Sequence, residues 1–176
     1  MSDSPLIVSL LLDEPTQERF EAERRELFPA GRTAVGAHVT LFHALPAGLR
    51  EDVEEVLARA ADRAPLPVAV EGVRSLGRGA AYDLSCPPLA GLHAGWQRRW
   101  AEHLTRQDAQ RLSLHVTVQN KVERDEARAT VERLRAAFEP WEATGTALEL
   151  WRYDDGPWTS LRRFAFSGAH GPEGRS

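Results

Sequence analysis

The sequence predicts a mixed α/β (α+β) domain of two similar halves, with antiparallel strands inside and helices outside. Short apolar runs rich in β-branched residues alternate with longer stretches that carry apolar residues at helical spacing. Two of the strand-like runs, residues 36–42 and 112–120, contain the same triplet His-Val-Thr. The order strand, helix, His-Val-Thr strand, helix, strand occurs twice, and one more strand follows. With 176 residues, 42% of them hydrophobic, the chain can bury the core of one such domain.

The first half contains three predicted strands and two predicted helices. The apolar run LIVSLLL has the length of a buried strand, and the DEP that follows it favours a helix start, since acidic residues and proline suit a first helical turn. From Val53, apolar residues recur at i, i+3, i+4 and i+7, which predicts the second helix. The predicted elements are a strand at 6–12, a helix to about Phe28, a strand near 35–42, a helix that ends at Pro65 and a strand at 67–76.

The second half repeats this order. Pro87 and Pro88 open a helix, and apolar residues at helical spacing from Ala127 to Phe138 predict another. The tetrapeptide DDGP is a strong turn signal between the last two strands. The predicted elements are a strand at 79–86, a helix to about Leu104, a strand at 112–119, a helix that ends before Pro140, and strands near 142–152 and 160–167.

The repeated order indicates an internal duplication. The motif histidines His38 and His115 are 77 residues apart (115 − 38), and the first strands of the two halves are separated by nearly the same interval. Duplicated units tend to pack about an approximate two-fold axis. We therefore expect a bilobal fold, with lobes at approximately 5–76 and 79–167, in which two antiparallel sheets line a central cleft. Residues 168–176 are expected to be a frayed tail.

The motif strands carry two kinds of side chain on their two faces. Because side chains alternate along a strand, His115 and Thr117 share one face, about 6.6 Å apart along the chain, and His38 and Thr40 do the same in the first half. A third triplet, at 103–105, lies at a helix end, where residues two apart do not share a face, and we treat it as coincidence. One such strand alone is more simply explained as part of a sheet whose polar face points to water. Two strands at equivalent places favour a site.

The paired motifs suit acid–base chemistry on a phosphodiester. An imidazole ordinarily titrates at about pH 6.5, so one of two facing histidines can be a neutral general base while the other is a protonated general acid. Threonine hydroxyls can hold the non-bridging phosphate oxygens between the two rings. We therefore predict His38 and His115 as catalytic residues and Thr40 and Thr117 as phosphate ligands, with a bell-shaped pH dependence and no metal or other cofactor. The sequence leaves open which histidine is the acid.

Other classes of site and partner find little support. The net charge of -4 and the pI near 5.9 argue against gripping long nucleic acid by bulk positive charge. The longest apolar run is far below the roughly 20 residues needed to span a bilayer, and MSDSP lacks the positive charge of a secretory signal, so we expect a cytoplasmic protein. A single cysteine, Cys86, excludes an intramolecular disulfide and a multi-cysteine metal site. No HExxH metal motif and no GxSxG nucleophile motif is present.

The segments AHVTLFHALP at 37–46 and LHVTVQNKV at 114–122 resemble the paired H-x-T motifs of the two-histidine (2H) phosphoesterase superfamily. That superfamily includes 2'-5' RNA ligase and cyclic phosphodiesterase proteins, and the resemblance covers most of residues 5–167. It implies a bilobal fold with a central cleft and metal-independent chemistry on 2',3'-cyclic phosphates or related nucleotide and RNA-end phosphodiesters. It also implies that the motif histidines are the acid and base, and that the motif threonines bind phosphate.

Further substrate contacts are expected around the motifs. Many ligase-like members of this superfamily carry an arginine shortly after the second motif, where this chain reads QNK. Lys121 has the parity of the second motif histidine and is a candidate to substitute. Three aromatic residues are candidates for stacking on a base: Phe42, Tyr82 and Trp151. Of these, Phe42 is expected on the same face as the first motif histidine.

We therefore expect a single 2H-like domain over 1–176, acting as a monomer on a nucleotide or an RNA end by hydrolysis, with reversible 2'-5' ligation as a second activity. One alternative is a nucleotide-binding protein that uses the same cleft without turnover. Another is a protein-interaction or structural role for a solvated sheet, which predicts that the four motif residues do not converge. The sequence leaves open the natural substrate and the choice between ligation and hydrolysis.

Overall fold

The computed structural model describes residues 3–29 and 35–168. In chain order the elements are β1 (Leu6–Leu12), α1 (Glu14–Leu27), β2 (Val39–Leu45), η1 (Ala47–Leu49), α2 (Arg50–Ala60), β3 (Leu66–Ser75), β4 (Ala80–Ser85), α3 (Pro87–Arg99), η2 (Ala101–His103), β5 (His115–Gln119), α4 (Arg124–Ala137), β6 (Trp141–Tyr153) and β7 (Trp158–Ala165). The predicted order of strands and helices is confirmed. Of the predicted tail, residues 169–176 lie outside the described part of the chain.

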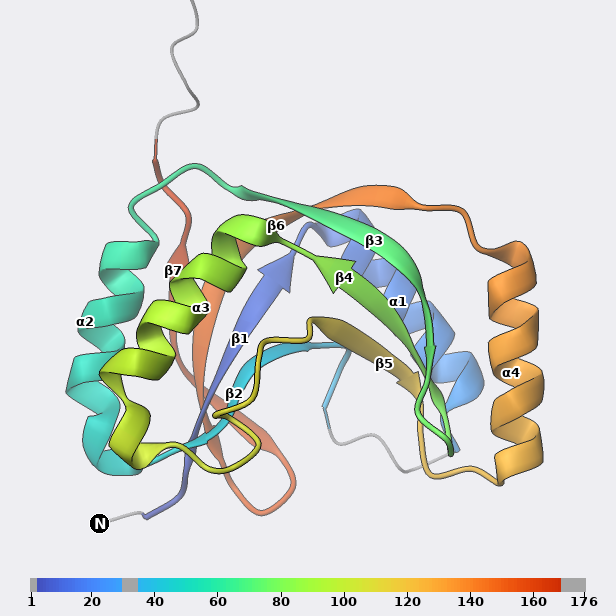
Figure 1. Cartoon of the computed structure of the whole chain (residues 1–176), viewed down its shortest axis with the longest axis horizontal. Helices are drawn as coiled ribbons and strands as arrows, with labels where there is room; N and C mark the ends of the chain where they lie inside the picture. Colours follow the sequence, from blue (N-terminus) through green and yellow to red (C-terminus); the bar gives the residue numbers. More distant parts are fainter. Residues whose placement is uncertain (1–2, 30–34, 169–176) are drawn as a thin grey trace, which may run out of the picture.

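The seven strands of the described residues form one antiparallel sheet, in the order β2-β1-β6-β3-β4-β5, with β7 also paired to β6. The long strand β6 divides this sheet, because β3 pairs with residues 141–145 and β1 and β7 pair with residues 145–153. We call β2, β1, β7 and the second part of β6 the first half-sheet, and β3, β4, β5 and the first part of β6 the second half-sheet (Figure 1). The predicted mixed fold with antiparallel strands is confirmed, but the strands form one continuous sheet rather than two separate sheets.

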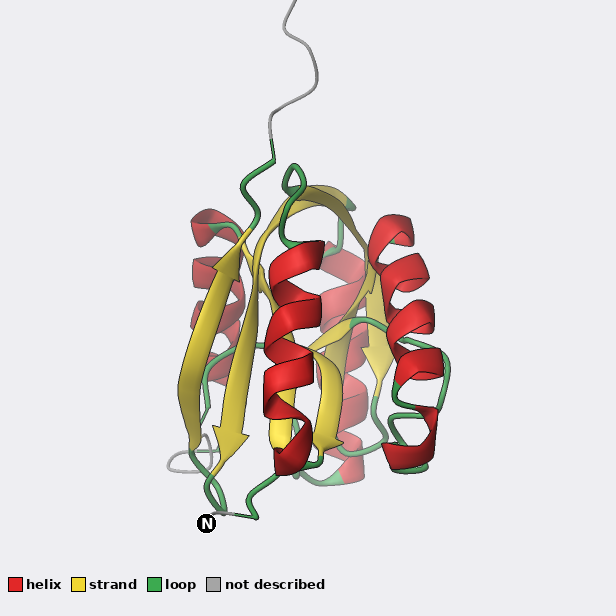
Figure 2. Cartoon of the chain, turned by 90° about the vertical axis from the view of Figure 1, so that its left-hand side faces the viewer, coloured by secondary structure: helices red, strands yellow, loops and turns green. Residues whose placement is uncertain are grey.

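Each half-sheet carries two helices, α2 and α3 on the first and α1 and α4 on the second (Figures 1 and 2). Phe42 of β2 stacks on His93 of α3 with ring centroids 4.5 Å apart, and Phe20 of α1 packs on Tyr82 of β4 at 5.3 Å. Helix α1, from the first half of the chain, therefore covers the half-sheet that contains β4 and β5, and α3, from the second half, covers the half-sheet that contains β1 and β2. Each lobe of the folded protein therefore contains a helix from the other predicted repeat. The duplication itself stays a prediction.

Both motif strands contain a β-bulge directly after the motif threonine. In β2 the threonine and Phe42 pair with consecutive residues of β1, which makes Leu41 an extra residue. In β5 the threonine and Gln119 pair with consecutive residues of β4, which makes Val118 an extra residue. A bulge interrupts the alternation of side chains, so residues beyond it point to the opposite face from the one that simple parity predicts. The equivalent bulges are a further similarity between the two halves.

The core lies between the sheet and the helices. The apolar stripes predicted for the helices face inward, and Leu57 and Leu89 are 0% exposed. Trp100, after α3, is 1% exposed and donates from Nε1 to Asp52 of α2 at 2.7 Å, which ties these two helices together. None of the described helices is long and apolar enough to cross a bilayer.

Asp108 fixes the loop before β5 to the edge strand β2. Its buried carboxylate accepts hydrogen bonds from the backbone N–H groups of His43 (2.8 Å) and Ala44 (2.9 Å) and from Nδ1 of His43 (3.1 Å). Burial alone would raise the pKa of Asp108, but these hydrogen bonds outweigh it and lower the pKa. The carboxylate therefore stabilises the fold above the pKa of an unfolded aspartate, and this contribution is lost as the pH falls through the lower, folded pKa.

Asp108→Asn should lower the free energy of unfolding by about 1–3 kcal/mol at neutral pH, because the amide nitrogen replaces an acceptor that faces backbone donors. The difference from wild type should shrink at strongly acidic pH, where the wild-type carboxyl is protonated. Urea denaturation at both pH values measures this. Asp62→Asn, at an exposed site, is the matched control and should change stability by less than about 0.5 kcal/mol. Equal effects of the two substitutions at neutral pH would contradict the role given to Asp108.

Candidate active site

The two motif histidines are held in the same way. Nδ1 of His38 lies 2.7 Å from the carbonyl oxygen of Gly36, and Nδ1 of His115 lies 2.8 Å from that of Ser113. Because a carbonyl oxygen can only accept, Nδ1 carries a proton in both rings. Nε2 is therefore the nitrogen available to a substrate in each ring, and both side chains are half-buried.

Strand pairing sets the faces of the motif threonines. Thr40 pairs with Ser9 of β1, and Thr117 pairs with Ala81 of β4. Both threonines are half-buried, whereas the valine between histidine and threonine is 1% exposed in each motif. The predicted alternation within the motifs is confirmed, with valine in the core and histidine and threonine on the more open face.

Helix α1 binds the chain on both sides of the motifs. Arg24, which is 6% exposed, donates from Nη1 to the carbonyl oxygen of Thr117 (2.5 Å) and from Nη2 to that of Val35 (2.9 Å). Glu21, about one turn earlier, accepts a hydrogen bond from the backbone N–H of Ala37 at 2.6 Å. One helix thus holds both the segment before the first motif histidine and the second motif strand, and the edge strands β2 and β5 come into contact. No pattern in the sequence predicts this role of Arg24, which depends on contacts between distant segments.

Burial and nearby positive charge lower the pKa of His38. Desolvation of the ring is the largest cause, the hydrogen bond to Gly36 opposes it, and the charges of Arg24, His115 and His43 lower the pKa further. The neutral ring, with Nε2 unprotonated, is therefore favoured near neutral pH. The contact between β2 and β5 brings the two motif strands together.

Two tryptophans stand beside His38. Trp158, at the start of β7, lies 4.6 Å from His38 between ring centroids, with an angle of 55° between the planes. Trp151 of β6 lies 5.8 Å from Trp158 and donates from Nε1 to Ser9 Oγ at 2.9 Å. Trp151 is one of the aromatic residues predicted for stacking. Trp158 carries no sequence signal, because its contact with His38 joins segments at opposite ends of the chain.

The predictions that Phe42 and Tyr82 contact substrate are wrong. Phe42 is 0% exposed among the side chains of α3, because the bulge at Leu41 turns it to the helix-covered face. Tyr82 is 2% exposed, and its hydroxyl donates to Oε1 of Glu23 in α1 at 3.0 Å. Both rings belong to the core.

The parity argument for Lys121 does not hold. The bulge at Val118 turns Gln119 to the helix-covered face, where it is 1% exposed and donates to Thr130 of α4 at 2.9 Å. Lys121 has a φ of 61°, in the left-handed region, so it lies beyond the end of the strand. The side chain is exposed, and a contact between Lys121 and substrate stays a prediction.

A pocket of about 600 Å³ lies beside the first motif histidine. Its walls come from β1, the start of α1, residues 35–38 and β6. They include Ser9, Glu149 and Trp151, which lie on the same face of the first half-sheet as Thr40 because their strands pair in register.

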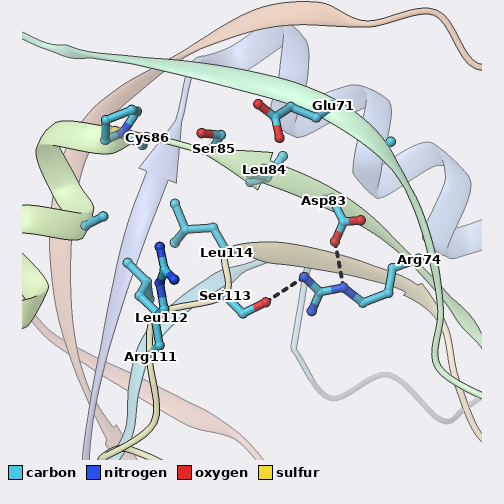
Figure 3. A pocket seen from close by; sticks show the side chains of 13 residues that line it. Glu71, Arg74, Asp83, Leu84, Ser85, Cys86, Arg111, Leu112, Ser113 and Leu114 are labelled. Carbon is cyan, nitrogen blue, oxygen red and sulfur yellow. Dashed lines mark hydrogen bonds and ion pairs between the residues drawn. The ribbon is translucent and has the colours of Figure 1, made fainter.

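A second pocket, of about 760 Å³, adjoins the second motif and is lined by parts of β3, β4 and residues 111–114 (Figure 3). Arg74 extends across it, donates to Ser113 Oγ at 2.6 Å and forms an ion pair with Asp83 at 2.6 Å. Ser113 is also the residue whose carbonyl oxygen holds His115. Ser113 therefore both lines this pocket and holds the ring of the second motif histidine.

The chemistry that this arrangement offers is proton transfer by two imidazoles beside two hydroxyl donors. Within residues 3–29 and 35–168, no group of three or more His, Cys, Asp or Glu side chains is placed to hold a metal ion. Cys86 is buried, and desolvation raises the pKa of its thiol, which makes it a poor nucleophile at neutral pH.

Known proteins share the sequence pattern and the fold of this chain. A sequence model of the 2'-5' RNA ligase superfamily matches residues 12–157. No curated protein matches the chain significantly. The structure of TT0787 from Thermus thermophilus has a TM-score of 0.66 at 18% identity and covers 94% of this chain and 100% of that one. E. coli LigT in complex with 3'-AMP has a TM-score of 0.65 at 17% identity, covering 94% of this chain and 99% of that one.

LigT complexed with NADP+ is also similar, with a TM-score of 0.60 at 18% identity, covering 95% of this chain and 99% of that one. At these identities the solved structures show a shared fold. The family match spans most of the chain and includes both His-Val-Thr motifs. The chain therefore belongs to the 2'-5' RNA ligase superfamily, a group of two-histidine phosphoesterases.

Proposed function

We propose that the protein is a metal-independent phosphodiesterase that opens 2',3'-cyclic phosphates or related phosphodiesters of nucleotides and RNA ends. The observation that carries this proposal is that the imidazole rings of His38 and His115 are held by the same kind of hydrogen bond. Each ring donates Nδ1–H to the carbonyl group two residues earlier and leaves Nε2 for the substrate. Cleavage of a phosphodiester needs one group that accepts a proton and one that donates a proton, and two such rings supply both.

The two histidines divide these tasks. His38 is the general base, because burial and the nearby Arg24 charge favour its neutral form. Its Nε2 takes a proton from the attacking water as the new phosphorus–oxygen bond forms. His115 is the general acid, and its Nε2 gives a proton to the ribose oxygen as the bond from phosphorus to that oxygen breaks. Reversible 2'-5' ligation uses the same groups with a ribose hydroxyl in place of water.

The threonines bind the phosphate between the rings. Thr40 of β2 and Thr117 of β5 follow the motif histidines at the same spacing, and both are half-buried. Their hydroxyls donate to the non-bridging oxygens, where negative charge accumulates in the transition state. Arg24 is buried, and its two terminal nitrogens donate to backbone carbonyl groups next to the two motifs. It acts as a positioning residue for the two motifs.

A small nucleotide or a single RNA end fits the charge and the surroundings of the site. The net charge of -4 does not favour long nucleic acid, whereas a few local donors suffice for one phosphate. The solved structures of the similar protein LigT contain 3'-AMP, NADP+, ATP or phosphate. The exposed part of Trp158 beside His38 offers an aromatic face to a base.

His38→Ala and His115→Ala should each lower kcat/KM for 2',3'-cyclic AMP, and for a short RNA with a cyclic phosphate end, by about 100-fold or more, because each removes one proton-transfer group. Wild-type turnover should persist in excess EDTA. Chromatographic separation of the monophosphate product from the cyclic substrate measures both results. His103→Ala, in the coincidental third triplet, is the matched control and should retain wild-type turnover.

Loss of turnover in EDTA would contradict metal-independent chemistry. A wild-type protein that binds these nucleotides through the motif histidines without turning them over would support the nucleotide-binding alternative instead. Calorimetric titration of 3'-AMP into the wild type and the two histidine variants separates these outcomes.

The acidic limb of the kcat/KM profile should lie below pH about 6.5, because it reports protonation of His38, whose pKa is lowered. Arg24→Met removes a positive charge near His38, so the pKa should rise and the limb should move to higher pH. Arg25→Met, at an exposed site on the same helix, is the control and should leave the limb in place. An acidic limb above the ordinary histidine pKa in the wild type would show that His38 is not the base.

A further inference from the structure

A row of paired residues leads from the first motif across the first half-sheet. Thr40 of β2 pairs with Ser9 of β1, Ser9 pairs with Glu149 of β6, and Glu149 pairs with Arg163 of β7. Directly paired residues point to the same face of a sheet, so Glu149 lies on the face of Thr40. Two strand spacings, about 10 Å, separate these two residues. A nucleoside whose phosphate lies at Thr40 can reach Glu149 with its base.

Glu149 is a buried carboxylate with one oxygen unpaired. The residue is 3% exposed. Oε1 accepts a hydrogen bond from Ser160 Oγ at 2.7 Å and lies 3.7 Å from Nη2 of Arg163. Among the described residues, Oε2 has no hydrogen-bond partner. Burial of a carboxylate oxygen without a donor is costly, so such a group points to a ligand that supplies the donor.

The pocket that Glu149 lines is rich in acceptors. It lies beside His38, has a volume of about 600 Å³, and contains further carboxylates on its α1 side: Asp13, Glu14, Glu18 and Glu21. Its cation Arg163 is already paired with Glu149. Negative charge of this kind repels phosphate, which therefore belongs on the side of the motif threonines. The pocket instead suits the part of a nucleoside that carries N–H or O–H donors.

The Watson–Crick edge of guanine matches a carboxylate best. It presents two adjacent donors, N1–H and the N2 amino group, whereas adenine presents one amino group next to an acceptor nitrogen that a carboxylate repels. Bases are commonly read by hydrogen bonds to this edge while they stack on an aromatic ring. Trp151 lines the same pocket as Glu149, and the ring of Trp158 lies against Trp151 and His38.

We propose that Glu149 recognises the Watson–Crick edge of a guanine base, and that the enzyme therefore prefers guanosine among nucleoside 2',3'-cyclic phosphates. This inference rests on the proposed function, since it requires the phosphate to lie between the motif histidines. Glu149 acts on substrate choice and not on proton transfer, so its substitution changes the ratio between substrates.

The test compares kcat/KM for the 2',3'-cyclic phosphates of guanosine, adenosine and uridine. Wild type should prefer the guanosine substrate by about 10-fold or more, and Glu149→Gln, which keeps the shape of the side chain, should remove most of this preference. Glu142→Gln, at an exposed site on the same strand, is the matched control and should keep the preference. Thermal unfolding checks that both variants fold.

Two results would overturn the inference. One is a wild type that turns over all three substrates equally. The other is a Glu149→Gln variant that loses turnover of the three to the same extent, which would indicate that Glu149 contacts the ribose they share. If wild type turns over none of them, the proposed function fails, and calorimetric binding of 3'-GMP against 3'-AMP still tests the guanine site.

Discussion

The buried guanidinium of Arg24 holds the two motifs at their spacing. It joins α1 to the segment before the first motif and to the backbone of Thr117 in the second motif. The first segment leads into β2 and the second lies in β5, and these two strands are not hydrogen-bonded to each other. A charge taken out of water needs partners, and two carbonyl groups accept hydrogen bonds from the guanidinium while the ring of Phe28 lies 4.3 Å from it. The cost of burying Arg24 thus favours one geometry of the site.

The two β-bulges separate the chemistry of the site from the packing of the core. Each bulge lies immediately after a motif threonine, so the polar face that carries histidine and threonine ends there. Beyond the bulges, Phe42 and Gln119 turn toward the helices and are 0% and 1% exposed. The extra residue in β2 also leaves the carbonyl oxygen of Leu41 to accept a hydrogen bond from Nε2 of His93 at 2.8 Å, which anchors α3 to the motif strand. The same irregularity therefore ends the site and supports the fold.

The motifs are held alike but have different surroundings, which suits two histidines with different tasks. His38 lies against Trp158 and feels the charge of Arg24. His115 is paired across strands with Asp83, whose carboxylate is bound to Arg74. An apolar and cationic setting favours the neutral imidazole of His38. The same motif sequence therefore occurs in two different electrostatic surroundings.

Local patterns in the amino-acid sequence were enough to predict the order of the elements, the face shared by histidine and threonine in each motif, and the buried valine between them. These features depend on the alternation of side chains and on helical spacing, which act over a few residues. The folded chain was needed to show that Phe42 and Tyr82 lie in the core, that Lys121 leaves the parity of its strand, and that one sheet replaces two. Folding also brings Arg24, Trp158 and Glu149 to the site. Bulges, helix exchange and buried hydrogen bonds arise from pairing between distant segments, and periodicity within one segment carries no information about such pairing.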